Sequence, residues 1–391
     1  MRLIRRLILG TFLTLGGALL AACVAMVIVP PFLDRLYYEG PESGHYTDGR
    51  FFNPEGVTYQ GMNGPRPGPA GLLSRLFAPS NWPAHVPVRP LDARALPPLA
   101  LGDMRAIWVG HATMLIQAGP YNILTDPIWA ERAGPFGITG PRRTTAPGIS
   151  IDKLPRIDAI VVSHNHYDHL DLPALKALWE RDRPAIVTGL GNETIIRRTG
   201  ADVIARDWGG MVTVKPGLTI RVLRNHHWSS RWLTDRNRAL WSAFMIDTPA
   251  GKVLFSGDTG FGDGHWIEEA RALGPVRLAL IPIGAFRFSA GQLANDSHIG
   301  PEEAVRMFQR IAPAQAIAMH WGTFKLSDEA RETPPGLLRL FMACAGVDPA
   351  RFLITTPGVP VKTPADKAQP VRPTRPASDC AAGSPAIAAF P

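Results

Sequence analysis

Cysteine is scarce in this chain, and its scarcity limits the kinds of metal site that the chain can hold. Only Cys23, Cys344 and Cys380 occur in 391 residues, and none lies near the histidine-rich stretch described below. A thiolate-based metal site is therefore excluded there. Cys344 and Cys380 could pair in an oxidising compartment, or one could be a buried thiol and the other a free thiol in the tail.

Long basic runs are missing as well. The net charge is +8, but the lysines and arginines are dispersed, apart from three arginines within the first six residues and the pair Arg142 and Arg143. Without a basic stripe, the sequence does not favour nucleic acid as a partner. A weak attraction for anionic lipid or phosphate stays open. The arginine pair could meet a lipid phosphate, but a solvated loop is the favoured interpretation.

One long apolar run stands at the N-terminus. Residues 7–33 carry no charge, and Arg2, Arg5 and Arg6 precede them. That length can span a bilayer, and the basic flank predicts an inner-membrane anchor with the rest of the chain exported to the periplasmic side. The sequence LLAAC, which ends at Cys23, resembles a bacterial lipobox and would make Cys23 a lipidated N-terminus. Because the run stays apolar beyond Cys23, an uncleaved anchor is the first interpretation and a lipoprotein the second.

The rest of the chain divides into three parts. Residues 34–104, rich in Pro, Gly and aromatics, are expected to form an extension that packs on the main domain. Between residues 105 and 357, strand patterns outnumber helical ones such as PALKALWERD, in two blocks each closed by helices. This predicts an α/β (α+β) domain with two sheets packed face to face and helices outside. The Pro/Ala-rich residues 358–391 are predicted to be disordered.

Metal-capable side chains crowd into one short stretch, SHNHYDHLD, at residues 163–171. It follows the apolar strand AIVV, so we expect a loop at the edge of a sheet. On a turning loop, His164 and His166 can converge on one metal while Asp168 and His169 face a second. Imidazole nitrogens and carboxylate oxygens are ligands that zinc accepts.

Further candidate ligands follow other predicted strands. His226 or His227 comes after TIRVLR, Asp258 lies in a G-D-T-G turn after KVLF, and His320 follows the buried strand AIAM. Taken singly, each could be a packed or turn residue. Together with the first loop they complete two metal sites, which is a strong reason to interpret them as ligands.

These residues resemble the signature of the metallo-β-lactamase superfamily, H-x-H-x-D-H followed by distant His, Asp and His. Within it, WVGHATMLIQ, LTDPIW, FSGDTGF and AMHWGTFKLSDE look like the branch of N-acyl-phosphatidylethanolamine-hydrolysing phospholipase D and its bacterial relatives. The resemblance covers residues 105–356, and GRFFNP in the extension matches too. It implies a four-layer αββα fold that holds two metals.

The resemblance also assigns the ligands. It implies that the first metal is bound by His164, His166 and His227. The second metal would be bound by Asp168, His169 and His320, and Asp258 would bridge the two. His227 is preferred to His226 because the family's ligand precedes a tryptophan, here Trp228. Two zinc ions are the implied cofactors, although iron or manganese can use the same ligands.

Three more residues receive expected roles. His298, just before a predicted helix, matches a histidine near the family's active site and is expected to orient substrate or donate a proton beside the catalytic Asp168 and Asp258. Its alternative is a plain helix-cap residue. His111 and Asp126 are expected behind the ligands, where they would orient them.

The implied activity is phosphodiester hydrolysis at a lipid surface. The first hypothesis is a membrane-anchored two-zinc enzyme of the phospholipase D type, in which a hydroxide bridging the metals attacks N-acyl-phosphatidylethanolamine-type phospholipids. The second is a lactonase or esterase on the same site, because this fold hosts many chemistries. The third is a membrane-tethered binding protein with a relict metal site. A phospholipid or another small molecule is the expected partner, and a homodimer is left open.

Overall fold

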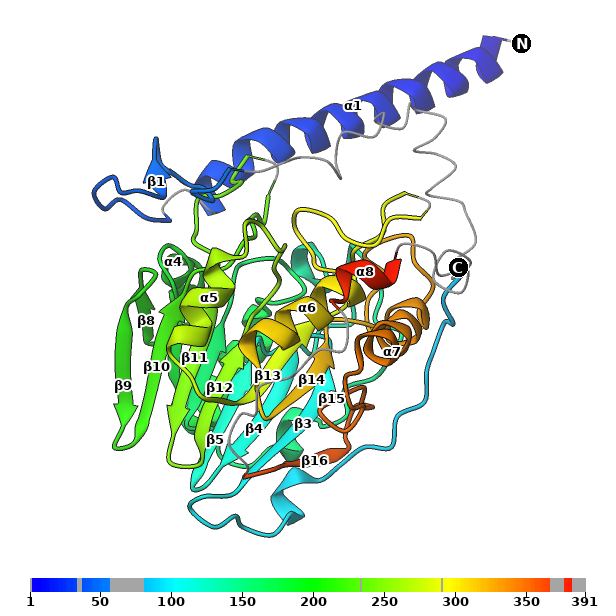
Figure 1. Cartoon of the computed structure of the whole chain (residues 1–391). Coiled ribbons are helices and arrows are strands. Elements are labelled where there is room, and N and C mark those ends of the chain that lie inside the picture. Colours follow the sequence, from blue (N-terminus) through cyan, green and yellow to red (C-terminus); the bar gives the residue numbers. More distant parts are fainter. Residues whose placement is uncertain are drawn as a thin grey trace.

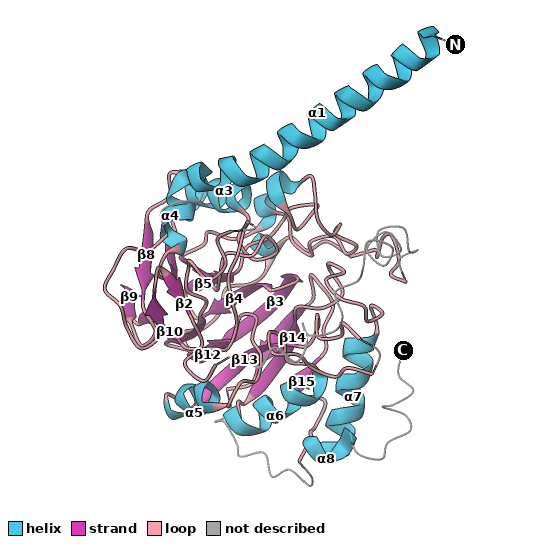
Figure 2. Cartoon of the chain, turned by 90° about the horizontal axis from the view of Figure 1, so that it is seen from above, coloured by secondary structure: helices cyan, strands magenta, loops and turns pink. Residues whose placement is uncertain are grey.

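Two seven-stranded sheets lie face to face, with helices on both outer sides. The computed structural model describes residues 2–33, 37–56, 81–232, 234–289, 291–365 and 376–381. In Figure 2, the helices α3 and α4 lie on one side of the strands, and α5, α6 and α7 lie on the other. The predicted four-layer αββα architecture is confirmed.

The first sheet has the strand order β16-β3-β4-β5-β6-β7-β8. Its pairs are antiparallel from β16 to β5 and parallel from β5 to β8. The strands are β3 (Met104–Gly110), β4 (Thr113–Ala118), β5 (Tyr121–Thr125), β6 (Ala159–Val162), β7 (Ala185–Gly189), β8 (Val203–Arg206) and β16 (Pro360–Thr363). The helices α3 (Leu172–Asp182) and α4 (Asn192–Ile196) belong to this half of the fold.

The second sheet has the order β15-β14-β13-β12-β11-β10-β9, antiparallel from β9 to β12 and parallel from β12 to β15. Its strands are β9 (Met211–Lys215), β10 (Leu218–Leu223), β11 (Ala243–Thr248), β12 (Gly251–Phe255), β13 (Val276–Pro282), β14 (Gln315–Met319) and β15 (Phe352–Leu353). The helices α5 (His265–Ala272), α6 (Pro301–Ile311) and α7 (Thr333–Ala345) cover its outer face (Figure 1).

Alternation along the strands builds the core between the sheets. In β3, Met104, Ala106 and Trp108 belong to the large cluster shared with the second sheet, whereas Ile107 and Val109 join the cluster under α3 and α4. Successive side chains of a strand point to opposite faces, so a strand that is apolar at every position is buried on both sides. This explains why the strands nearest the site read as continuous apolar runs.

The end of the histidine-rich loop and the start of α3 are fixed by one carboxylate. Asp171 accepts a hydrogen bond from the Ala174 backbone N–H at 3.1 Å, which caps the helix. Its other oxygen accepts from the backbone N–H groups of Trp129 and Ala130, both at 2.9 Å. A capping residue of this kind contributes about 1 kcal/mol. Here it also ties the loop after β5 to the loop after β6.

The described parts of the N-terminal region include a long helix and an extension that touches the core. The helix α1 (Arg2–Leu33) contains one candidate membrane span, Ile4–Ala25, none of which is buried against the rest of the chain. The extension holds the short strands β1 (Tyr46–Thr47) and β2 (Arg50–Phe51). Its Tyr46 and Phe51 are buried against Leu240 and Trp241.

The C-terminal segment differs from the predicted disordered tail. Residues 360–363 form β16, which pairs antiparallel with β3, and Arg277 donates to the carbonyl of Thr363 at 2.7 Å. Further on, α8 (Ser378–Ala381) is joined to α7 by a Cys344–Cys380 disulfide. The apolar residue Val361 packs on the core despite its Pro-rich surroundings, so the boundary at residue 357 cuts through the sheet. The remaining tail residues lie outside the described ones.

A chain that ends at Thr356 should be much less stable than a chain that ends at Pro364. The shorter form loses β16 and leaves the guanidinium of Arg277, whose side chain is largely buried, without the carbonyl of Thr363. We expect a loss of about 3 kcal/mol in the free energy of unfolding, because the sheet loses an edge strand and the Arg277 guanidinium keeps only the carbonyl acceptors of Gly102 and Ala250. Urea unfolding of both forms measures this. Equal midpoints would show that β16 is dispensable.

Candidate metal centre

The site residues leave the strands at one edge of the two sheets. His111 follows β3, Asp126 follows β5, His164 comes two residues after β6, and His320 follows β14. Since parallel strands place their carboxyl ends at the same edge, β5 with β6 and β12 with β14 bring their loops together.

Three of these residues have left-handed backbone. The φ angle is 55° at His111, 30° at Asp126 and 59° at His320, and each is the first residue past the end of its strand. Such a conformation costs about 1 kcal/mol or more for a residue with a side chain, and strained residues cluster at functional sites. The sharp turn aims each side chain inward, at the edge of the sheet.

Three histidines form the first donor group. The ligand-type atoms of His164, His166 and His227 lie within 4.8 Å of one another, and His164 Nε2 is 2.8 Å from His166 Nδ1. His164 and His227 are buried, and His166 is partly buried. Burial, together with the neighbouring histidines, holds the pKa of His164 and His227 well below the usual value and lowers that of His166 to about 3. Their nitrogens therefore carry free electron pairs at neutral pH.

The second donor group surrounds Asp258. Its Oδ2 lies 3.0 Å from His169 Nε2 and 2.9 Å from His320 Nε2, while Asp168 Oδ2 lies 3.5 Å and 3.6 Å from the same two nitrogens. Asp258 is also grouped with His227 of the first donor group. It therefore lies between the two groups.

Charge in the second group is balanced by protons when no metal is bound. Burial alone would raise the pKa of Asp258, but the positive charge of His169 and His320 holds it well below its usual value. Burial would likewise lower the pKa of His320, but Asp258 and Asp168 raise it to about 9. A divalent cation would replace these protons, because ligand imidazoles must be neutral.

Neighbouring groups hold the candidate ligands in position. Asp126 Oδ2 is 2.6 Å from His169 Nδ1, and the carbonyl oxygen of Ser297 is 2.9 Å from His227 Nδ1, so the Nε2 atom of each ring is left facing the site. His111 Nε2 is 2.9 Å from Asp168 Oδ2. His111 and Asp126 thus contact candidate ligands directly, and their orienting role stays a prediction. Partners of this kind fix the tautomer and ring orientation of metal ligands.

A glycine permits the close approach of two loops beside Asp258. Gly257 has a φ of 59°, and a side chain at this position would bring its Cβ to 2.8 Å from the Cβ of Ser163. Ser163 in turn donates from its backbone N–H to Asp126 Oδ1 at 2.7 Å. The loop after β12 can therefore lie directly against the loop after β6.

The donor set fits metal ions. Among the described residues, the buried Nε2 atoms of His166 and His227 and the Oδ1 atom of Asp258 have no hydrogen-bond partner, and the Nε2 atoms of His169 and His320 face only carboxylate oxygens of the same site. Buried polar atoms without partners are costly in a protein, and here they converge from separate loops. Two adjacent sets of nitrogen and carboxylate donors that share one aspartate match the requirements of a two-metal site.

His298 belongs to this site rather than to a helix cap. Its Nδ1 is 3.7 Å from Asp258 Oδ2, and its ring centroid is 5.2 Å from that of His227. The residue that caps α6 is Gly300. Burial lowers the pKa of His298 to about 4, so the ring is neutral at neutral pH.

Two residues of the extension support the site, and the sequence analysis did not identify them. Asn53 donates from Nδ2 to the carbonyl oxygen of His227 at 2.9 Å and accepts from Trp241 Nε1 at 3.1 Å. Glu55 Oε1 is 2.6 Å from His226 Nδ1. His226 therefore faces the extension, while His227 faces the donor group. The only signal for these residues in the sequence was the GRFFNP match, and this match does not show which residues Asn53 and Glu55 contact.

The two adjacent arginines have different environments. Arg142 is exposed, as expected for a loop residue, but Arg143 is buried. Arg143 donates to the carbonyl oxygens of Ile128 and Ala130 and stacks on Phe324. The interpretation as a solvated pair is wrong for Arg143, because its side chain ties together the loops around His111.

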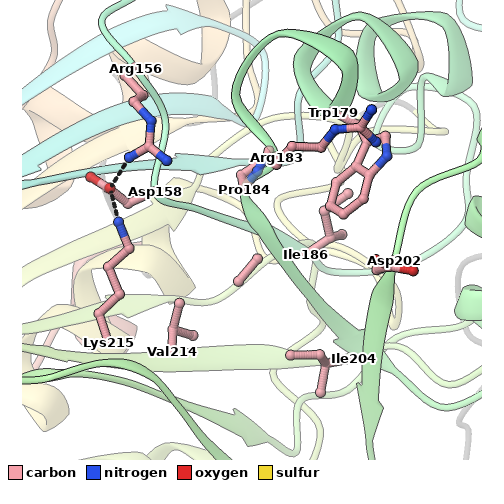
Figure 3. Close-up of a pocket in the computed structure, with 11 residues that line it drawn as sticks. Arg156, Asp158, Trp179, Arg183, Pro184, Ile186, Asp202, Ile204, Val214 and Lys215 are labelled. Carbon is pink, nitrogen blue, oxygen red and sulfur yellow. Dashed lines mark hydrogen bonds and ion pairs between the residues drawn. The ribbon is translucent and has the colours of Figure 1, made fainter.

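The pocket shown in Figure 3, with a volume of about 260 Å³, is not part of this site. Asp158 lies there between Arg156 and Lys215, so its charge is balanced inside the pocket (Figure 3). Asp158 immediately precedes β6, whereas His164 follows it. The pocket therefore lies at the opposite edge of the sheet from the metal centre.

Comparison with known proteins decides the family. The pattern described as Beta-lactamase superfamily domain matches residues 121–321, about half of the chain. The chain belongs to the beta-lactamase superfamily. It is 31% identical over 301 residues to an uncharacterized protein of Mycobacterium tuberculosis, covering 75% of this chain and 76% of that protein. As a member of this superfamily with these relatives and this donor set, it is a metal-dependent hydrolase.

Two further similarities concern the branch and the fold. The chain is 36% identical over 231 residues to N-acyl-phosphatidylethanolamine-hydrolyzing phospholipase D 1 of Caenorhabditis elegans, covering 56% of this chain and 64% of that protein. It therefore spans less than two thirds of that relative. The crystal structure of isothiocyanate hydrolase from Delia radicum gut bacteria superposes with a TM-score of 0.52 at 20% identity, covering 66% of this chain and 98% of that one. That likeness supports the beta-lactamase superfamily fold.

Replacement of Asn53 by alanine should weaken the metal site that includes His227. The variant loses the hydrogen bond that fixes the loop of His227. Loss of a supporting contact of this kind lowers metal affinity by about tenfold or more. Zinc affinity against a competing chelator, and the absorption spectrum of the Co²⁺ form, measure the change.

Glu42→Gln is the matched control on the same extension, because Glu42 is exposed and bonds only locally, to Thr47 and Asp48. If Asn53→Ala lowered the melting temperature but left the zinc affinity and the Co²⁺ spectrum unchanged, Asn53 would have only a folding role.

Proposed function

We propose that this hydrolase is a membrane-anchored phosphodiesterase of the phospholipase D type, which uses two zinc ions to cleave N-acyl-phosphatidylethanolamine-type phospholipids. The observation that carries the proposal is the pair of adjacent donor groups that share Asp258. The relative from C. elegans, named for this activity, supports the substrate class. Nitrogen and carboxylate donors support zinc.

Each donor group would hold one cation. His164, His166 and His227 would bind the first, and Asp168, His169 and His320 would bind the second, with Asp258 shared between them. Two bound zinc ions would supply Lewis acidity toward the phosphate oxygens and lower the pKa of water. The chain's own task is to keep the donors rigid and largely shielded from solvent, which the strained turns and the Asp126 and Ser297 contacts accomplish.

His298 would orient the substrate. Its ring is neutral at neutral pH and lies beside both donor groups, so it can accept or donate one hydrogen bond to a substrate oxygen without bringing a charge. Such a contact, made best when charge develops in the transition state, raises turnover rather than binding alone.

Two features support an inner-membrane location with the catalytic domain on the periplasmic side. The exposed apolar helix Ile4–Ala25 has the length of a membrane span, and Arg5 and Arg6 lie near its N-terminal end. The Cys344–Cys380 disulfide fits an oxidising compartment. Cys23 lies exposed within α1 and remains the position for a lipid if the chain is processed as a lipoprotein.

Metal content and turnover on the same sample test the activity. We expect about two zinc ions per chain and cleavage of both bis(p-nitrophenyl) phosphate and N-acyl-phosphatidylethanolamine. His166→Ala should lose zinc and activity together. His298→Ala should keep its zinc and lose turnover by about a hundredfold, the usual scale for a positioned imidazole.

Turnover of lactones or esters, without any phosphodiester cleavage, would keep the metal centre and move the function to that hydrolase class. Full activity in His166→Ala would contradict the ligand assignment itself.

Membrane retention and mass test the anchor. In a bacterial host, Cys23→Ser should change the mass only by the replacement of sulfur with oxygen and leave the membrane fraction unchanged, because α1 alone holds the protein. Thiol trapping without reductant should find Cys344 and Cys380 unreactive. A mass that drops in Cys23→Ser by the size of a lipid group would replace the anchor with a lipoprotein, and reactive thiols would place the domain in a reducing compartment.

A further inference from the structure

The loop from Gly134 to Gly140 carries two large apolar side chains into solvent. Phe136 is 80% exposed and Ile138 is 72% exposed. Outside α1, these are the two most exposed large apolar side chains among the described residues. Single exposed apolar residues are ordinary, but two at the tip of one loop, one residue apart, form a small apolar point on the surface.

The loop is closed at its base, so this exposure is built into its shape. The backbone N–H of Ala133 donates to the carbonyl oxygen of Pro141 at 3.0 Å, and Arg132 donates to the carbonyl oxygen of Gly140 at 2.9 Å. A side chain at Gly140 would bring its Cβ to 2.2 Å from the carbonyl oxygen of Ala133. The two arms of the loop therefore meet at a narrow neck, and among the described residues the side chains of Phe136 and Ile138 stay largely exposed.

The backbone at the tip is strained, and no burial of the side chain within the chain compensates for the strain. Phe136 has a φ of 58° and a ψ of 10°, a left-handed conformation that is rare for a bulky residue. Burial of its ring would offset that strain, but the ring is not buried within the chain. Strained residues cluster at functional sites. The exposed ring of Phe136 is therefore a candidate for contact with a partner outside the chain.

The surroundings of the tip suit a lipid surface. Arg142 is exposed beside the neck, with the exposed Glu131 carboxylate 3.9 Å from its Nε, and Arg132 flanks it from the other arm, so the neck carries two cations and one anion. Behind the loop lies a hollow of about 420 Å³, lined by Phe136, Leu170, Ile195 and Trp232 together with Arg198 and Arg231. Tyr167 also lines it, and Tyr167 follows the candidate ligand His166 in the sequence. The apolar tip and the metal centre thus lie on neighbouring parts of one face.

We propose that the loop 134–140 is a second membrane contact, in which Phe136 and Ile138 enter the acyl region of an anionic bilayer and Arg132 and Arg142 meet the lipid phosphates. Apolar side chains that enter a bilayer and basic side chains near its surface reinforce each other. The helix α1 alone would only tether the hydrolase to the membrane. The second contact would also orient the hydrolase so that its metal centre faces the membrane. The inference rests on the proposed lipid substrate, but it concerns different residues.

The full chain in anionic vesicles tests the contact. Ile138→Cys is combined with Cys23→Ser and labelled with an environment-sensitive fluorophore, while the disulfide protects Cys344 and Cys380. We expect nitroxide groups on the lipid acyl chains to quench this label at least about twofold more than a label at the control position Leu101→Cys. Leu101 is 65% exposed and precedes β3, whose far end carries His111, so it lies at the other edge of the sheet.

Function is measured on the same membranes. In the double variant Phe136→Ser with Ile138→Ser, the ratio of lipid turnover to turnover of a water-soluble phosphodiester should fall about tenfold, because only the lipid reaction needs the docked orientation. The soluble substrate reports separately on the fold and the metal centre.

The possible outcomes separate the two proposals. A label at 138 that stays in water, or is shielded without quenching by the acyl chains, overturns the membrane contact, and the second result would indicate a protein partner. Quenching at 138 in a chain that cleaves no lipid leaves the contact standing and sinks the proposed activity. An unchanged turnover ratio in the double variant would also overturn the contact.

Discussion

The structure depends on the burial of opposite charges around Asp258. Two carboxylates and several imidazoles are enclosed where protein groups satisfy few of their inner atoms. Without a cation, protons on His169 and His320 must balance Asp258 and Asp168. The surrounding chain keeps these groups together against their cost of desolvation. The strained turns at three strand ends, the Asp126 contact and the extension can all be understood as supports for this arrangement.

Much of this centre could be predicted from the sequence, because its residues fall where apolar strands end. The stretch from Ser163 to Asp171 is dense in donors, and Asp258 and His320 follow strands whose continuous apolar pattern is easy to recognise. The resemblance then chose His227 over His226, and the contact of His226 with Glu55 agrees with that choice. A local sequence pattern is enough to predict a site residue when that residue directly follows its strand in the sequence.

The parts that could not be predicted depend on distant partners. Strand β16 is four residues long and lies in a Pro-rich stretch, so only its pairing with β3 defines it. Arg143 has the same side chain as its exposed neighbour Arg142, and only Phe324 and the loop carbonyls distinguish them. The same holds for Asn53, since nothing near it in the sequence shows that both ends of its amide are used. Tertiary contacts of this kind leave no periodic signal.

The pairing of β16 with β3 has a consequence for biogenesis. The strand that completes the first sheet comes from residues 360–363, whereas its partner begins at residue 104. The first sheet therefore cannot be completed before residues 360–363 have been synthesised. Partly built sheets with open edges are prone to aggregate, so an exported chain of this topology would need protection until its last residues arrive.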